Sequence, residues 1–205
     1  MKIITVSREF GSGGREIAKR LSDILGIAYY DREIITEIAK RAELDEGYVA
    51  HSLEKGVQPN FQIHFANAFS HISAPDPTVK LLAAQHNIIT ELASKGDCII
   101  VGRAADVLLE MYEPFRIFVY ADMKSRIARC RARAAEGTDL TDKEIEKKIK
   151  QIDKGRASSY GMLASTSWGD KKGYDLCINT TNINIKDITP FIAEYAKKWF
   201  EEKNL

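Results

Sequence analysis

The sequence contains no apolar run that approaches the roughly 18 residues needed for a membrane-spanning helix. Its formal net charge is only +1, so it lacks the basic excess that is typical of proteins that bind nucleic acid polymers. The N-terminus "MKIITVS" enters a strand-like pattern directly, without the features of a secretory signal. These absences predict a cytoplasmic protein whose partners include neither a membrane nor a nucleic acid polymer.

Cysteine is also scarce. The three cysteines, Cys98, Cys130 and Cys177, lie far apart, and no metal-ligand spacing links them to one another or to the four histidines. We therefore expect buried free thiols in a reducing compartment and no metal site built by the protein.

What the sequence does contain is a regular alternation of apolar strands and amphipathic helices. Five short runs that are continuously apolar predict buried parallel strands at 2–7, 27–30, 98–102, 116–121 and 175–180. Such strands alternating with helices predict an α/β fold of three layers, in which a five-stranded parallel sheet carries helices on both faces.

The helical segments carry their own boundary signals. Ile17, Leu21, Ile24 and Leu25 are spaced to share one helix face. Thr141 and Glu144 have the spacing of a capping box. Pro190 is expected in the first turn of the last helix, since proline is favoured there.

Two connections are too long for a simple crossover between strands, although 205 residues fit a single domain, 1–205. They are the segments 31–96 and 131–174. Both begin at the carboxyl end of a predicted strand, which is where α/β sheets bind ligands. We therefore expect both segments to cover the functional site.

A glycine-rich stretch, "SREFGSGGREIAKRL" (7–21), joins the first strand to the first helix. A phosphate-binding P-loop occupies this position and reads G-x-x-x-x-G-K-[ST], with backbone N–H groups and the helix N-terminus holding phosphate oxygens. The lysine is missing here. If Gly13 is the second glycine, Gly14 stands at the lysine position; if Gly14 is the second glycine, Arg15 does. A glycine-rich turn that binds no ligand is the alternative.

The loop nevertheless predicts a binding site for ATP with Mg²⁺. Glu16 lies near the helix N-terminus, where its negative charge interacts favourably with the helix dipole. The same charge repels a polyphosphate unless Glu16 pairs with an arginine or a magnesium ion. The missing positive charge could come from Arg8, Arg15 or an arginine of a covering segment. The predicted nucleotide-binding residues are Arg8, Gly11, Ser12, Gly13, Gly14, Arg15 and Glu16.

Arginines and acids near other strand ends complete a candidate site. Asp31, Arg32 and Arg103 follow the second and third strands, where they could hold an acceptor phosphate. Arg129, Arg133, Asp153 and Arg156 lie in or near the second long segment and are the candidate catalytic residues. The alternatives are a helix cap for Asp31, a solvent-facing arginine at a helix start for Arg103, a solvated basic face for the arginines at 129 and 133, and a local surface ion pair for Asp153 and Arg156.

Taken together, these pieces resemble the cytidylate kinase-like family of P-loop nucleoside monophosphate kinases. The resemblance covers nearly the whole chain and rests on "SREFGSGGREIAKRL", "YYDREII", "IIVGRAAD", "IDKGRASSY" and "WGDKKGYDLCINT". It implies that 31–96 is an insertion that binds the monophosphate and that 131–174 holds a mobile lid. Through Ala18 and Leu21, it also places Gly14 at the lysine position.

Matches and departures both occur within this resemblance. Arg103 is similar to the arginine of the family's "GRD" motif, although Ala104 replaces the following aspartate. Asp153 matches the first acid of the family's "RD" motif. Of the family's motif that follows the second strand, this sequence keeps only the aspartate, as Asp31. Residues that would bind the cytosine base or the ribose are not recognisable in this sequence.

The resemblance implies transfer of the γ-phosphoryl group of ATP to a nucleoside monophosphate, CMP among them, or to another small acceptor. The alternative is a nucleotide- or anion-binding protein that has lost this chemistry. Oligomeric state is not indicated by the sequence, because the aromatic residues within 61–70 fit a buried helix as well as a dimer contact.

Overall fold

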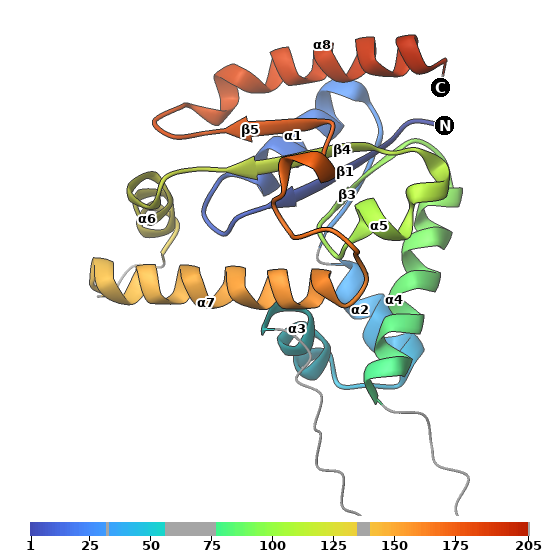
Figure 1. The fold of residues 1–205 in the computed structure, drawn as a ribbon, viewed down its shortest axis with the longest axis horizontal. Helices are drawn as coiled ribbons and strands as arrows, with labels where there is room; N and C mark the ends of the chain where they lie inside the picture. Colours follow the sequence, from blue (N-terminus) through green and yellow to red (C-terminus); the bar gives the residue numbers. More distant parts are fainter. Residues whose placement is uncertain (32, 56–76, 135–139, 205) are drawn as a thin grey trace, which may run out of the picture.

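The computed structural model describes residues 1–31, 33–55, 77–134 and 140–204. Within these residues one parallel sheet runs in the order β2-β3-β1-β4-β5, which confirms the predicted five-stranded sheet (Figure 1). Its strands are β1 (Ile3–Arg8), β2 (Ala28–Tyr30), β3 (Cys98–Val101), β4 (Phe115–Tyr120) and β5 (Leu176–Asn179).

Helices cover both faces of the sheet and make the three predicted layers (Figure 1). Successive strand residues point to opposite faces, so Ile3 packs with helices on one side and Ile4 with helices on the other. The first side is covered by α2 (Glu33–Ala42), α3 (Glu46–Lys55), α4 (Pro77–Ser94) and α5 (Ala105–Leu108). The second is covered by α1 (Gly14–Leu25) and α8 (Ile185–Lys203).

The prediction that all five strands are buried is wrong for β2 and β5. Residues of these two strands are exposed or half-buried because both strands lie at the edges of the sheet. Cys177 on β5 is exposed for the same reason, whereas Cys98 on β3 is buried. The three cysteines are free, as expected.

Two helix predictions also need correction. Ile17 and Leu21 are fully buried, but Ile24 is 45% exposed. Pro190 lies inside α8 instead of in its first turn, because the Asn184 side chain caps the helix upstream by accepting from the Lys186 N–H at 3.1 Å. The capping box at Thr141 is confirmed at the start of α7 (Asp142–Gly161).

The two long connections, 31–96 and 131–174, are largely helical where the structure describes them. The first contributes α2, α3 and α4, and the second contributes α7 and the short helix η2 (Lys171–Gly173). α3 packs against α7, so the two segments meet beneath the sheet (Figure 1). Two further short elements are η1 (Glu110–Tyr112) and α6 (Met123–Ala132). The aromatic stretch 61–70 lies outside the described residues. None of the helices within those residues is both long and apolar enough to cross a membrane.

Candidate functional site

The glycine stretch forms the turn between β1 and α1. Gly11 and Gly13 adopt positive φ values of 80° and 87°, which glycine accepts without strain. The first helical bond of α1 joins the Ile17 N–H to the Gly13 carbonyl at 3.0 Å. The N–H groups of the first turn therefore have no helical acceptor, which is the arrangement that binds anions at helix N-termini.

Close packing from two other helices fixes the shape of this turn. A Cβ atom at Gly11 would lie 2.9 Å from the Arg126 carbonyl of α6, and one at Gly13 would lie 2.7 Å from Cδ1 of Ile185 in α8. The two glycines thus permit contacts that any side chain would prevent. The turn is a packed structural element in addition to a candidate phosphate cradle.

The structure gives a reason for the glycine at position 14, which the family resemblance places at the lysine position. A Cβ atom at Gly14 would lie 2.6 Å from Cβ of Arg8, too close for any real pair of atoms. The guanidinium of Arg8 extends over Gly102 at the end of β3, and its Nη2 lies 3.9 Å from the Asp31 carboxylate. A lysine at position 14 and the present placement of Arg8 therefore exclude each other.

Arg126 anchors the turn to α7. Its side chain is buried, donates to the Phe10 carbonyl at 2.8 Å, and forms ion pairs with Asp153 and, at 3.1 Å, with Glu9. Asp153 also accepts from the Phe10 N–H at 2.8 Å. The predicted catalytic Asp153 thus lies at the junction of α7 and the turn, bonded to the chain of the turn itself.

The predicted arginines of the second segment also converge on the turn. Arg129 donates to the Ser12 carbonyl of the turn at 3.5 Å and to the Thr180 carbonyl, in the loop after β5, at 2.5 Å, while burial and the neighbouring Arg133 lower its pKa. Arg133 pairs with Glu16 at 2.7 Å, which supplies the arginine partner that Glu16 was expected to need.

Arg156 completes this group of arginines. It donates to the Arg8 carbonyl at 2.9 Å and lies 3.9 Å from Asp153. The interpretation of Asp153 and Arg156 as a local surface pair is wrong, because both are largely buried and both contact the turn.

Asp31 is 5% exposed and does not stand apart as a binding group. Its carboxylate lies 2.5 Å from Nε of Arg15 and accepts from the Tyr29 hydroxyl at 3.3 Å. Burial, followed by the charge of Asp31, raises the pKa of Tyr29 to about 12. Arg32, the other residue predicted after β2, lies outside the described residues.

A cavity of about 540 Å³ opens above the glycine turn, between the turn, the end of α6 and α7. Its walls hold one acidic residue, Glu9, against seven basic ones, and Leu140, Ile145 and Ile152 form an apolar part. The basic residues are Arg8, Arg15, Arg129, Arg131, Arg133, Lys148 and Arg156. Such an excess of positive charge at a helix N-terminus suits a polyanion.

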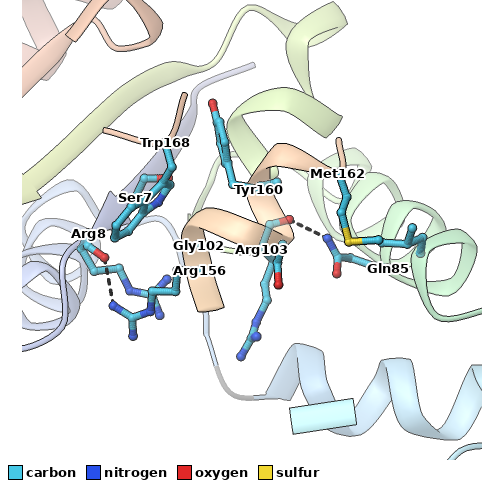
Figure 2. Close-up of a pocket in the computed structure, with 12 residues that line it drawn as sticks. Ser7, Arg8, Gln85, Gly102, Arg103, Arg156, Tyr160, Met162 and Trp168 are labelled. Atoms are coloured by element: carbon cyan, nitrogen blue, oxygen red, sulfur yellow. Dashed lines mark hydrogen bonds between the residues drawn. The ribbon is translucent and has the colours of Figure 1, made fainter. Parts of the chain in front are cut away.

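A second, much smaller pocket of about 50 Å³ lies at the carboxyl ends of β1 and β3 (Figure 2). Arg8 and Arg156 line both cavities, so the two adjoin. Figure 2 shows these two arginines on one side of the small pocket and Gln85 and Met162 on the other. Arg103, predicted to hold the acceptor, also lines it.

The backbone at the end of β3 is strained. Gly102, Arg103 and Ala104 are consecutive residues with positive φ values of 72°, 59° and 50°. Residues other than glycine adopt this conformation at a cost, and such strain is concentrated at functional sites. The amide of Gln85, from α4, holds the segment by donating to the Arg103 carbonyl at 2.8 Å (Figure 2).

A buried network behind the small pocket was missed by sequence reasoning. Asp106 is 4% exposed and accepts from the Tyr160 hydroxyl at 2.8 Å and from the Ser7 hydroxyl at 3.5 Å. Burial raises the pKa of Asp106, and burial together with the charge of Asp106 raises that of Tyr160. The motifs "IIVGRAAD" and "IDKGRASSY" contain Asp106 and Tyr160, but nothing in their spacing indicates that the two side chains meet.

The carboxylates near the turn do not form a metal site. Each of them is paired with an arginine: Glu9 and Asp153 with Arg126, Glu16 with Arg133, and Asp31 with Arg15. No group of three or more histidine, cysteine or acidic residues suited to a metal ion occurs in the part of the chain that the structure describes. The residues present therefore do not fit a Mg²⁺ ion held by the protein.

Comparisons with solved structures show the same architecture in kinases. An uncharacterized protein from Eubacterium ventriosum is 24% identical, with a TM-score of 0.69 and coverage of 96% of this chain and 99% of that one. Shikimate kinase from Bacteroides thetaiotaomicron is 15% identical, with a TM-score of 0.57 and coverage of 96% and 98%. A gluconokinase from Sinorhizobium meliloti is 13% identical, with a TM-score of 0.56 and coverage of 99% and 95%. At these identities the likeness concerns the fold, which is that of the P-loop kinases.

The comparison with family models agrees with the resemblance that the motifs indicate. No curated protein sequence is significantly similar to the chain. The model of the cytidylate kinase-like family, however, matches residues 3–182, from the first residue of β1 to the loop that follows β5. The chain therefore belongs to the cytidylate kinase-like family.

Proposed function

We propose that the protein is an ATP-dependent phosphotransferase that moves the γ-phosphoryl group to an acceptor bound at the end of β3. The observation that carries the proposal is the basic cavity of about 540 Å³ above the N-terminus of α1. The family and the kinase fold support the same reaction class. The acceptor is a nucleoside monophosphate such as CMP or another small molecule.

In this proposal the triphosphate lies along the glycine turn. The N–H groups of the first turn of α1 bind its oxygens, and Arg129, Arg133 and Arg156 neutralise its charge from α6 and α7. The apolar wall of Leu140, Ile145 and Ile152 suits the base of the nucleotide. Magnesium arrives bound to the nucleotide phosphates, since the nearby carboxylates are paired with arginines.

Arg8 takes the place of the missing lysine. Its side chain occupies the space that a residue larger than glycine at position 14 would need, and it lines both cavities. A guanidinium there can contact the phosphoryl group as it passes from donor to acceptor. Arg15 is the weaker candidate because its Nε lies 2.5 Å from the Asp31 carboxylate.

Asp153 has a positioning role. It bonds the Phe10 N–H and the Arg126 guanidinium, and through them it holds α7 over the turn. The segments 31–96 and 131–174 act as acceptor-binding insertion and lid, and the packing of α3 against α7 couples them.

The test begins with ATP and magnesium. A ligand that binds only the folded state raises the melting temperature by mass action, so millimolar ATP–Mg²⁺ should raise it by several degrees. Arg8→Ala should reduce the ATP affinity more than Arg15→Ala. Lys19→Ala serves as the control, because Lys19 is exposed and lies on the same helix as Arg15. An unchanged melting temperature at millimolar ATP would contradict the proposal.

A second candidate function is binding of a nucleotide or anion without transfer. It is favoured by the missing lysine and by the pairing of each nearby carboxylate with an arginine. Both functions predict ATP binding, so ATP consumption in the presence of CMP and small hydroxyl compounds separates them. Binding without consumption of ATP would favour this second function.

A further inference from the structure

We propose that the acceptor is a small anion that carries a carboxylate or phosphate group and at least one hydroxyl, and that the pocket at the end of β3 excludes nucleoside monophosphates. This inference rests on the proposed phosphotransferase function, because it assigns the substrate class of the same site. Size, charge and one unpaired polar atom in the pocket support it.

The size of the pocket argues against a nucleoside. Its volume is about 50 Å³, whereas sites for ligands of drug size measure roughly 300–1,000 Å³. Its walls include buried groups from three separate elements: Ser7 of β1, Gln85 of α4 and Tyr160 of α7. A base and a ribose would have to displace packed side chains, while a few heavy atoms would not.

The charge of the pocket selects an anion. Arg8, Arg103 and Arg156 line it, and none of its lining residues in the described part of the chain is acidic. Asp31 and Asp153 lie outside the lining, 3.9 Å from Arg8 and Arg156 respectively, and the buried Asp106 accepts from the hydroxyls of Ser7 and Tyr160. Three guanidinium groups around so small a volume suit one carboxylate or phosphate group, which arginine can bind in a bidentate manner.

An unpaired atom of Gln85 indicates a hydroxyl on the ligand. Gln85 is 2% exposed, and its Nε2 donates to the Arg103 carbonyl, which fixes the orientation of the amide (Figure 2). Its Oε1 is buried without a hydrogen-bond partner among the described residues. A buried acceptor left unpaired costs about 1–3 kcal/mol, and a donor on the ligand removes that cost.

The position of the pocket fits phosphoryl transfer. Arg8 and Arg156 form the wall that it shares with the nucleotide cavity, so an acceptor bound here lies beside the γ-phosphate. A hydroxyl oxygen of the acceptor forms a bond to the γ-phosphorus. The bond from that phosphorus to the β–γ bridging oxygen breaks, its electron pair leaves with ADP, and the hydroxyl proton ends in water.

The experiment compares acceptors of matched chemistry at saturating ATP–Mg²⁺. Glycerate and glycerol 3-phosphate carry both an anion and a hydroxyl, glycerol lacks the anion, and CMP and UMP carry both on a nucleoside. We expect kcat/KM for glycerate or glycerol 3-phosphate to exceed that for glycerol, CMP and UMP at least tenfold. Preference for CMP or UMP, or ATP binding with turnover of neither small anion, would overturn the inference.

Calorimetric titration with ATP separates this inference from the proposed function. Lack of ATP binding contradicts the phosphotransferase itself, and with it the acceptor. ATP binding with CMP as the preferred acceptor contradicts only the acceptor class. Each result therefore points to one of the two proposals.

Two variants test the recognition groups. Gln85→Met keeps the size of the side chain and removes the acceptor Oε1 together with the Nε2 donor to the Arg103 carbonyl, so the KM for the small anion should rise about fivefold to tenfold. Gln151→Met is the matched control, since Gln151 is exposed on α7 and does not line the pocket. Arg103→Met should remove the preference for glycerate over glycerol. An unchanged KM in folded Gln85→Met, or an unchanged preference in Arg103→Met, would count against the inference.

Discussion

The large cavity above the glycine turn and the small pocket at the end of β3 meet at Arg8 and Arg156, but they are built differently. Much of the wall of the large cavity comes from exposed side chains of α6 and α7, among them Arg131, Arg133 and Lys148. The small pocket is lined by the ends of two central strands, by the buried Gln85 and by a strained backbone segment.

This difference suits two tasks. A nucleotide that brings its own charge and its own magnesium needs a broad positive surface, and long arginine side chains can adapt to it. An acceptor that must be distinguished from similar molecules needs fixed walls and fixed hydrogen-bonding groups, because unpaired buried polar atoms provide discrimination. We therefore expect substitutions around the large cavity to change affinity and those around the small pocket to change selectivity.

The largest expected effect concerns Arg126, which holds the wall of the large cavity in place. Removing one partner from a buried ion-pair network costs about 3–5 kcal/mol, because the remaining charges are left without compensation. Arg126→Ala should therefore lower the free energy of unfolding by about that amount, since Glu9 loses its arginine and Asp153 keeps only Arg156, 3.9 Å away. Urea unfolding followed by circular dichroism measures the change.

A matched control lies on the same helix. Arg131 pairs with Asp142, but both side chains are more than half exposed, so Arg131→Ala should change the free energy of unfolding by less than about 0.5 kcal/mol. If Arg126→Ala proved as mild as Arg131→Ala, the turn would not depend on its anchor to α7. The contrast between an anchored turn and an adaptable wall would then be wrong.

The next effect concerns the wall that the two cavities share. Gly14→Ala places a Cβ atom 2.6 Å from Cβ of Arg8, so we expect a loss of about 1–3 kcal/mol from overpacking. In an Arg8→Gly background the obstructing side chain is absent, and the same change should cost at least about 1 kcal/mol less. A double-mutant cycle of urea unfolding gives this coupling.

The cycle also bears on the missing lysine. Gly14→Lys meets the same Cβ atom, so adding the P-loop lysine should destabilise the protein unless Arg8 is also changed. If Gly14→Ala were neutral and showed no coupling to Arg8, then Arg8 would not be the reason for glycine at this position. Another arginine would then be the stronger candidate for the missing charge.

The donor site was easier to predict from the sequence than the acceptor pocket. The glycine turn, its flanking strand and helix, and the capping box at Thr141 are local patterns, and the structure contains them. Arg129, Arg133 and Arg156 were expected in or near the segment that covers the site, and all three line the large cavity.

Apart from Arg8, Arg103 and Arg156, the groups of the small pocket could not be predicted in this way. Gln85 lies within a helix, and nothing in the sequence around it indicates that its amide reaches the Arg103 carbonyl. The contact between Asp106 and Tyr160 joins residues 54 positions apart. Whether a strand residue is buried also depends on strand order, so β2 and β5 were expected in the core although they lie at the edges. Each of these features depends on tertiary packing and has no local sequence signal.

The smallest expected effect is a pH dependence from the network behind the small pocket. Burial raises the pKa of Asp106 above its ordinary value of 3.8. The contribution of such a carboxyl group to folded-state stability is fully present below pH 3.8, its ordinary pKa. That contribution is lost as the pH rises through the raised pKa. The free energy of unfolding of the wild-type protein, relative to Asp106→Asn, should therefore fall as the pH rises from 4, by at most about 1.4 kcal/mol per pH unit.

Asp122 provides a control of opposite sign, because it caps α6 in an exposed position. Hydrogen bonds from the Ser125 side chain and backbone lower the pKa of Asp122. Its contribution is therefore present above its ordinary pKa of 3.8 and is lost as the pH falls through the lowered value. Urea unfolding of the wild-type protein, Asp106→Asn and Asp122→Asn between pH 3 and 7 measures the two slopes. If the difference in free energy of unfolding between the wild-type protein and Asp106→Asn did not change with pH, the wall behind the small pocket would be open to water. The contrast between a rigid pocket and an adaptable cavity would then be wrong.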